Sequence, residues 1–303
     1  MVECENLALP ASSGREDIHS HVWTDGSPKA ILQIAHGMAE HSARYDEFAR
    51  FVAGHGYAVF AEDHAGHGPS AETKGYFAEK DGWECILKDM KALMDAASAR
   101  YPGLPLFLLG HSMGCFLAQS YIIRFMGLKG AILSGDTAPN HALRLGRALA
   151  AMQKRLKGPT SVGKFISAMA FGGYNRKIDH PVNQFAWLST VDQVCEEYKA
   201  DPFCGYSFTA GGYYDMFTGM IEITARDWPS KVPAGLPVLI IAGDQDPVGA
   251  YGKGPKGLFD GLRQTGHGDV SMKLYPGDRH EVLNEKNKYE VYDDVLAWLE
   301  GHI

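Results

Sequence analysis

Short and almost continuous apolar runs alternate along this chain with segments whose apolar residues recur at helical spacing. A strand with one solvated face alternates apolar and polar residues, whereas a strand buried on both faces is apolar throughout. The pattern therefore predicts an α/β fold, in which helices cover both faces of a mostly parallel sheet. Asp81 and Glu84 are spaced as in a capping box, so we expect a helix to begin there. The apolar runs cover residues 30–36, 57–63, 104–110, 130–135, 238–243 and 270–275.

The alternation of strands and helices stops between residues 137 and 229. This stretch keeps helical patterns and is rich in glycine and aromatic residues, but it contains no run that resembles a core strand. A loop of this length without secondary structure is uncommon inside a compact domain. We therefore expect a core domain made of residues 1–136 and 230–303, and a helical cap of residues 137–229 inserted into it.

The segment Gly110-His111-Ser112-Met113-Gly114 matches the pattern G-x-S-x-G and lies between a predicted strand and a predicted helix. In that context the pattern forms a nucleophile elbow, a tight turn that lifts the serine above the carboxyl edge of the sheet. Glycines flank the serine because the turn crowds its neighbours, and the helix that follows points its positive end at the same place. We predict that Ser112 is a nucleophile, supported by His111 and Gly114.

A serine hydroxyl needs a base, and in this architecture the acid and then the histidine follow the serine along the chain. His280 comes directly after the run 270–275, whereas His267 precedes that run and His302 lies at the end of the chain. We predict His280 as the base. Asp244 and Asp246 both follow the run 238–243. Asp246 is the preferred acid because the chain then turns away at a proline, and Asp244 is the alternative, better suited to holding the turn.

An acyl-transfer site also needs two N–H groups that hold the oxyanion of the tetrahedral intermediate. The residue after the nucleophile supplies one of them, and the loop after an early strand supplies the other. We predict the N–H groups of Met113 and Met38 in these roles. His36 and Gly37 support Met38, since a glycine lets the backbone approach the substrate closely.

Five segments of the chain resemble the monoacylglycerol lipase and lysophospholipase branch of the α/β hydrolases. Two further segments in the expected cap, WLST (187–190) and DPFCGYSFT (201–209), resemble its bacterial members. The resemblance implies an α/β-hydrolase fold with an inserted helical cap over an apolar acyl tunnel. It also implies Ser112, Asp246 and His280 as the catalytic triad, and Met38 and Met113 as the oxyanion donors. The chain departs from the family at Cys115, where a second glycine is common. The segments are HGMAEHSARY (36–45), DHAGHGPS (63–70), GHSMG (110–114), GDQDPVG (243–249) and PGDRHEV (276–282).

Composition limits the partners and the compartment that we expect. The formal net charge is -7 and the isoelectric point is about 6.0, which disfavours binding to nucleic acid. The five cysteines are an odd number without metal-ligand spacing, so we expect free thiols. The first residues lack the apolar stretch of a signal peptide, and no run is long enough to span a bilayer, so we expect a cytoplasmic protein.

The predicted activity is the hydrolysis of carboxylic esters of lipids through an acyl-enzyme on Ser112, with no cofactor. A monoacylglycerol or a lysophospholipid is the preferred substrate, and a short-chain or aromatic ester is the alternative. A peptidase of the prolyl aminopeptidase type would need a cap carboxylate such as Glu196 or Glu197, and a ligand-binding protein without activity is a third reading. His64 and His67 lack a third ligand in the sequence, so we predict no metal. The sequence indicates no oligomeric state.

The predicted cap begins with a basic amphipathic helix in an otherwise acidic chain. No acidic residue lies between Asp136 and Asp179, and apolar residues share one helical face. The pattern suits a surface that docks on anionic lipid, and it equally suits a cap helix that packs its leucines on the core. The basic residues are Arg144, Arg147, Lys154, Arg155, Lys157, Lys164, Arg176 and Lys177.

Overall fold

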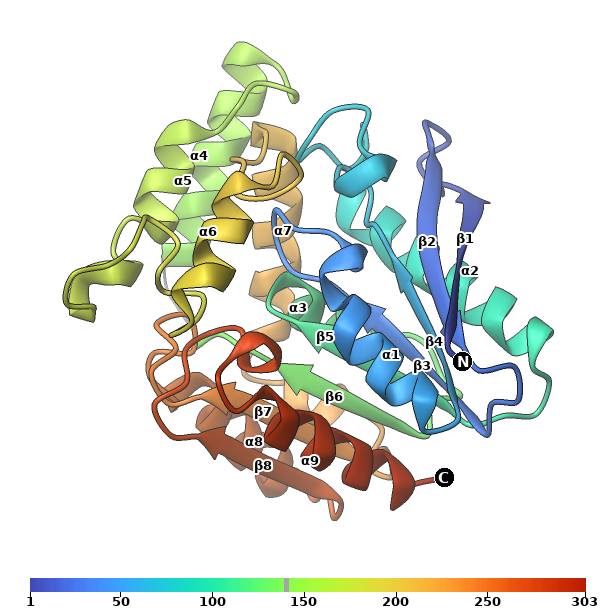
Figure 1. Cartoon of the computed structure of the whole chain (residues 1–303). Helices are drawn as coiled ribbons and strands as arrows, with labels where there is room; N and C mark the ends of the chain where they lie inside the picture. Colours follow the sequence, from blue (N-terminus) through green and yellow to red (C-terminus); the bar gives the residue numbers. More distant parts are fainter. Residues whose placement is uncertain (139–141) are drawn as a thin grey trace.

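A computed structural model of the chain describes residues 1–138 and 142–303. Eight strands form one sheet in the order β1-β2-β4-β3-β5-β6-β7-β8 (Figure 1). The strands β3 to β8 run parallel, and β2 joins them through an antiparallel pairing with β4. The strands are β1 (Glu3–Pro10), β2 (Asp17–Thr24), β3 (Ala30–Ala35), β4 (Tyr57–Glu62), β5 (Leu106–His111), β6 (Gly130–Ser134), β7 (Val238–Gly243) and β8 (Val270–Tyr275).

The central strands are apolar because both faces of the sheet are covered. Every residue of β3, β4, β6 and β7 is buried. On one face the strands pack against α1 (Asp46–Gly54) and α9 (Lys288–Glu300), and on the other against α2 (Gly82–Arg100), α3 (Met113–Ile122) and α8 (Lys253–Gln264) (Figure 1). The prediction of a mostly parallel sheet with helices on both faces is confirmed.

Helices fill the segment between β6 and β7. They are α4 (Ala142–Lys157), α5 (Lys164–Phe171), α6 (Asp192–Ala200) and α7 (Ala210–Ile223), and among the described residues no strand of the sheet lies there. α7 contacts α2 and α3 of the core on one side and α4 on the other, while α4, α5 and α6 stand together beyond the edge of the sheet (Figure 1). The region 137–229 is therefore helical as expected, and its division from the core as a cap remains a prediction.

α2 begins where the sequence predicts a helix, but without the predicted capping box, and the first part of the sheet differs from the prediction. Asp81 precedes the helix at a φ of 50°, and its side chain accepts no capping hydrogen bond. Glu84 instead accepts from Arg124 at 2.7 Å, so the predicted capping box is wrong. The strands β1 and β2 were not expected from the sequence.

The remaining expectations concern cysteines and the membrane. All five cysteines are free thiols. Among the described helices, none is long and apolar enough to cross a bilayer.

Candidate active site

Ser112 occupies a strained turn between β5 and α3. Its φ of 55° and ψ of -118° lie outside the conformations that most side chains adopt. The two glycines of the motif make the turn possible, because a Cβ on Gly110 would lie 2.2 Å from the carbonyl oxygen of Gly114. A Cβ on Gly114 would lie 1.9 Å from the carbonyl oxygen of Ala35 in β3. The sheet and the helix therefore meet so closely here that only glycine fits.

Two loops at the same edge of the sheet bring Asp246 and His280 together. Nδ1 of His280 donates to Oδ2 of Asp246 at 2.8 Å, and both side chains are buried. The other oxygen of Asp246 accepts from the backbone N–H of Val248, also at 2.8 Å. This carboxylate is thus fixed by its own turn and holds one tautomer of the imidazole, which leaves Nε2 as the free acceptor.

The other candidates for the acid and the base have structural contacts elsewhere. Asp244 accepts from the backbone N–H of Gly277 at 2.9 Å, which ties the turn after β7 to the turn after β8. His267 lies before β8 and contacts the carbonyl oxygen of Val232 at 3.1 Å. His302 contacts Asp269 near the end of the chain. None of the three lines the cavity above Ser112, as far as the described residues show.

Ser112 and His280 line one cavity of about 580 Å³. Nε2 of His280 is buried and has no hydrogen-bond partner among the described residues, Ser112 included. In the absence of substrate a catalytic hydrogen bond of this kind is often long, and it shortens when the reacting groups are bound. The ring of His280 packs against two other rings, that of His111 at 4.8 Å and that of Trp187 at 5.1 Å between centroids.

The peptide between Gly37 and Met38 is held from outside the cavity. Nε2 of His36 accepts from the backbone N–H of His64 at 3.0 Å, so Nδ1 of His36 carries the proton and donates to the carbonyl oxygen of Gly37 at 2.8 Å. The N–H of Met38 belongs to the same trans peptide, so it points the opposite way from that carbonyl group. Met38 and Met113 both line the cavity beside Ser112.

Known proteins resemble both this sequence and this fold. The sequence model of the family described as "Serine aminopeptidase, S33" matches residues 26–287. The chain belongs to this family of α/β hydrolases. A monoacylglycerol lipase of Mycolicibacterium smegmatis is 30% identical over 287 residues, which are 93% of this chain and 92% of the relative. The mouse monoglyceride lipase is 40% identical over 280 residues, 92% of this chain and 84% of the relative.

Among solved structures, a carboxyl esterase from Bacillus coagulans in complex with glycerol superimposes on this hydrolase with a TM-score of 0.93. It is 30% identical, and the match covers 99% of this chain and 98% of the esterase. A proline iminopeptidase from Pestalotiopsis fici is also related, at 26% identity over 285 residues. The resemblance to monoacylglycerol lipases that the sequence motifs indicate is thus confirmed, within a family that also contains peptidases.

The electrostatic surroundings of the hydrolase's two active-site histidines differ. Burial lowers the pKa of His280, but the carboxylates of Asp246, Glu281 and Glu40 outweigh burial, and the pKa is raised above its ordinary value of 6.5. Burial and the neighbouring His280 lower the pKa of His111 to about 3. His111 therefore stays neutral at physiological pH, while His280 is able to carry a proton.

The loop after β4 places His64 and His67 in the packed floor of the site. The rings of His36 and His64 lie 4.1 Å apart, and those of His36 and His67 lie 5.0 Å apart, between centroids. Burial lowers the pKa of all three, so they pack as neutral imidazoles. Neither His64 nor His67 belongs to the group of three possible metal ligands found among the described residues, which is His41, Asp201 and Cys204.

The cavity of the hydrolase is apolar on the side of the inserted helices. Its apolar lining includes Leu143, Ile166, Phe171, Met216, Phe217 and Met220. Two features of the site were not predicted from the sequence: Trp187 against His280, and a buried group of charges made of Glu40, Arg44 and Glu281. All three charged residues belong to the motifs 36–45 and 276–282. Their closeness was hidden because the two motifs lie far apart in the chain.

Proposed function

We propose that this hydrolase cleaves the carboxylic ester of single-chain lipids, with a monoacylglycerol as the preferred substrate, through an acyl-enzyme on Ser112. One observation supports this most strongly. The elbow serine lies on a cavity with His280, which is paired with Asp246, and the other wall of this cavity is apolar. The monoacylglycerol lipases of M. smegmatis and mouse, related over nine-tenths of this chain, support the same substrate class.

The reaction follows from the geometry. His280 accepts the proton of Ser112 through Nε2 while Oγ attacks the ester carbonyl carbon, and Asp246 stabilises the imidazolium that forms. The N–H groups of Met38 and Met113 bind the oxyanion of the tetrahedral intermediate. The imidazolium then gives its proton to the leaving glycerol oxygen. Water, deprotonated by the same ring, hydrolyses the acyl-enzyme and releases the fatty acid.

A peptidase activity is the second candidate because the family also contains peptidases. The cap carboxylates considered for that role lie on α6. Glu196 accepts from Asn183 and Glu197 accepts from Gln193, each at 2.8 Å, and neither is among the described residues that line the cavity. The carboxylates that do line the cavity are those of Glu40 and Glu281, and both are paired with Arg44. Among the described residues no cavity carboxylate is therefore free to bind a substrate amine, and the ester remains the preferred substrate.

A lipid surface is the proposed site of action. Leu145, Met152 and Leu156 of α4 and Phe165 and Met169 of α5 are exposed, so they do not pack on the core. The basic residues Arg144, Arg155, Lys157 and Lys164 accompany them and form no ion pair among the described residues. Apolar side chains with a basic rim suit insertion into the headgroup region of an anionic bilayer.

Steady-state hydrolysis of monoacylglycerols of graded chain length, of a short-chain nitrophenyl ester and of a proline arylamide tests this function. We expect the highest kcat/KM for a monoacylglycerol, no cleavage of the arylamide, and loss of at least about 10³-fold in Ser112→Ala. A higher kcat/KM for the arylamide than for the monoacylglycerols would contradict the proposal. Full activity of folded Ser112→Ala would contradict the nucleophile.

A further inference from the structure

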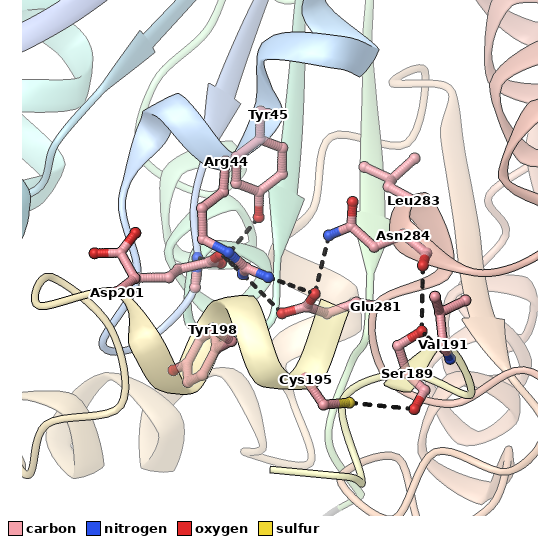
Figure 2. A network of polar contacts seen from close by, with 12 residues as sticks. Arg44, Tyr45, Ser189, Val191, Cys195, Tyr198, Asp201, Glu281, Leu283 and Asn284 are labelled. Atoms are coloured by element: carbon pink, nitrogen blue, oxygen red, sulfur yellow. Dashed lines mark hydrogen bonds and ion pairs between the residues drawn. The ribbon is translucent and has the colours of Figure 1, made fainter. Parts of the chain in front are cut away.

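Arg44, whose side chain is only 13% exposed, lies between two carboxylates that come from distant parts of the chain. Its Nη1 donates to Oε2 of Glu40 at 2.5 Å and to Oε1 of Glu281 at 2.8 Å. Its Nη2 donates to the second oxygen of Glu281, also at 2.8 Å (Figure 2). The planar guanidinium thus grips Glu281 with both nitrogens, a geometry that an ammonium group does not reproduce.

Each carboxylate lies next to one part of the proposed machinery. Oε1 of Glu40 accepts from the backbone N–H of Gly37 at 2.5 Å, one peptide before the N–H of Met38. Glu281 directly follows His280 in the chain. The side-chain amide of Asn284 donates to Glu281 at 2.9 Å and helps to fix that loop (Figure 2). Arg44 therefore connects the segment that carries the oxyanion donor to the segment that carries the base.

The inserted helices close over the same cluster. The guanidinium carbon of Arg44 lies 4.8 Å from the centre of the Tyr198 ring on α6. The hydroxyl group of Tyr198 donates to the carbonyl oxygen of Ala39 at 2.8 Å, and Ala39 has a strained φ of 53°. The backbone N–H of Glu281 donates to the carbonyl oxygen of Leu188 at 2.7 Å. These contacts cover most of the surface of Arg44 and its partners.

A buried cluster of this kind contributes little to stability, because removing the charges from water offsets most of their attraction. The net charge of the cluster is more informative about its effect on His280. Burial raises the pKa of Glu40, but this carboxylate accepts hydrogen bonds from Gly37, Tyr45 and Arg44, which favour its ionised form. Arg44 outweighs burial to hold the pKa of Glu281 at about 2. Two carboxylates and one guanidinium leave one negative charge close to the ring that becomes cationic during the reaction.

We propose that Arg44 is a positioning residue that fixes the oxyanion segment relative to the His280 loop, and that the carboxylate of Glu281, which Arg44 holds in place, stabilises the imidazolium. The inference rests on the proposed roles of Ser112 and His280. The titratable or charged groups around His280 are Asp246 after β7, His111 at the end of β5, Glu281 on its own loop, and Glu40 and Arg44 in the segment after β3. Removing the charge of Glu281 should therefore lower the pKa of His280.

The test compares pH profiles of kcat/KM for the wild type, Glu281→Gln and the control Glu285→Gln. Glu285 lies in the same loop and accepts from Thr190 and Arg279, so it fixes the loop without being among the groups named around His280. In Glu281→Gln we expect the acid limb to move to lower pH by about half a unit or more, with a lower plateau. Glu285→Gln should at most lower the plateau of kcat/KM, and its acid limb should stay at the pH of the wild type. An acid limb at the same pH in the wild type and in Glu281→Gln would overturn the proposal.

Arg44→Lys provides a second measurement that does not depend on the folding of Glu281→Gln. It keeps the positive charge but loses the paired hydrogen bonds, so we expect kcat to fall about 10-fold while KM changes less than about 2-fold. An unchanged kcat in Arg44→Lys would overturn the positioning role. A wild-type profile without any acid limb would instead contradict His280 as the base, so the two failures are distinguishable.

Discussion

The N–H group of Met38, the proposed oxyanion donor, owes its direction to the side chains of His36 and Glu40. His36 donates to the carbonyl oxygen of Gly37, which belongs to the same peptide as the N–H of Met38. Glu40 accepts from the N–H of Gly37, in the preceding peptide. An oxyanion donor is effective only if it is oriented before the reaction, because reorienting it during the reaction costs free energy. At the scale of single residues, the proposed mechanism therefore makes catalysis depend on a buried neutral histidine, His36.

Replacing His36 with phenylalanine removes the donor to Gly37 and leaves the N–H of His64 without its acceptor. We expect kcat/KM to fall about 10- to 100-fold, mainly in kcat, because the Met38 N–H loses its fixed direction. Loss of the buried hydrogen bonds should also lower the free energy of unfolding by about 1 to 3 kcal/mol. Steady-state kinetics and urea unfolding measure the two effects.

The matched control is His67→Phe. His67 is equally buried and packs against Phe77 and Phe208, but it has no hydrogen bond to the Gly37–Met38 peptide. We expect a change in stability with a kcat close to that of the wild type. A loss of kcat as large as that of His36→Phe would show that packing, and not the orientation of the peptide, explains the effect.

Sequence order was sufficient to select Asp246 and His280 as candidates, because parallel strands end at one edge of the sheet and each candidate follows such a strand directly. The Arg44 cluster is different. Its partners Arg44 and Glu281 are 237 positions apart, and neither charge has a local pattern that indicates burial. Such a contact depends on the folded arrangement of two loops, and a single sequence contains no signal for it.

Among the elements, the strands with two buried faces were predictable and the outer ones were not. The runs 57–63 and 238–243 correspond to β4 and β7, whose residues are all buried. β1 lies at the edge of the sheet and most of its residues are exposed, so its sequence lacks an apolar run. β2 is buried at alternate positions only over its first half, which is too short a pattern to stand out.

Two helical glycines give opposite predictions for the same substitution. A Cβ on Gly114 in α3 would lie 1.9 Å from a carbonyl oxygen of β3, whereas a Cβ on Gly257 in α8 would have no atom within 4 Å. We expect Gly114→Ala to destabilise the protein by about 3 kcal/mol, because the helix must move away from the sheet. Gly257→Ala should stabilise it by about 0.5 to 1 kcal/mol, since alanine favours a helix.

Urea unfolding of both variants, followed by circular dichroism, measures these changes. Esterase activity gives an independent check, because the shift of α3 in Gly114→Ala also displaces the N–H of Met113. A Gly114→Ala variant as stable and as active as the wild type would show that the elbow is not packed as tightly as described.

On the scale of the whole molecule, α4 and α5 lie side by side on the outer side of the inserted helices (Figure 1). The side chain of Leu156 is 74% exposed and that of Phe165 is 67% exposed, far more than in helices that pack on a core. The rest of the molecule carries a formal excess of acidic residues, so this basic region is the part suited to an anionic bilayer. The proposed cap would then bring the cavity to the lipid.

Sedimentation with vesicles tests the proposed contact with lipid. Arg155→Gln combined with Lys157→Gln should weaken binding to anionic vesicles roughly 30-fold, because each of the two basic residues near the surface contributes about 1 kcal/mol. Binding to neutral vesicles should not change in that variant. Leu156→Ser combined with Phe165→Ser should weaken binding to both kinds of vesicle.

The matched control for the apolar pair is Met126→Ser, because Met126 is 75% exposed but lies between α3 and β6, outside the inserted helices. It should bind like the wild type. Equal binding of all variants to both kinds of vesicle would contradict the docking surface, and it would leave the chemistry of Ser112 untouched.

Covalent labelling with a fluorophosphonate tests most directly whether His280 activates Ser112. We predict one adduct, which peptide mapping by mass spectrometry places on Ser112, and a labelling rate that rises with pH through a midpoint above 6.5, because His280 reacts as the neutral base and its pKa is raised. Folded His280→Ala should label at least about 10³-fold more slowly. An adduct on another residue, or equal labelling of His280→Ala, would contradict the account.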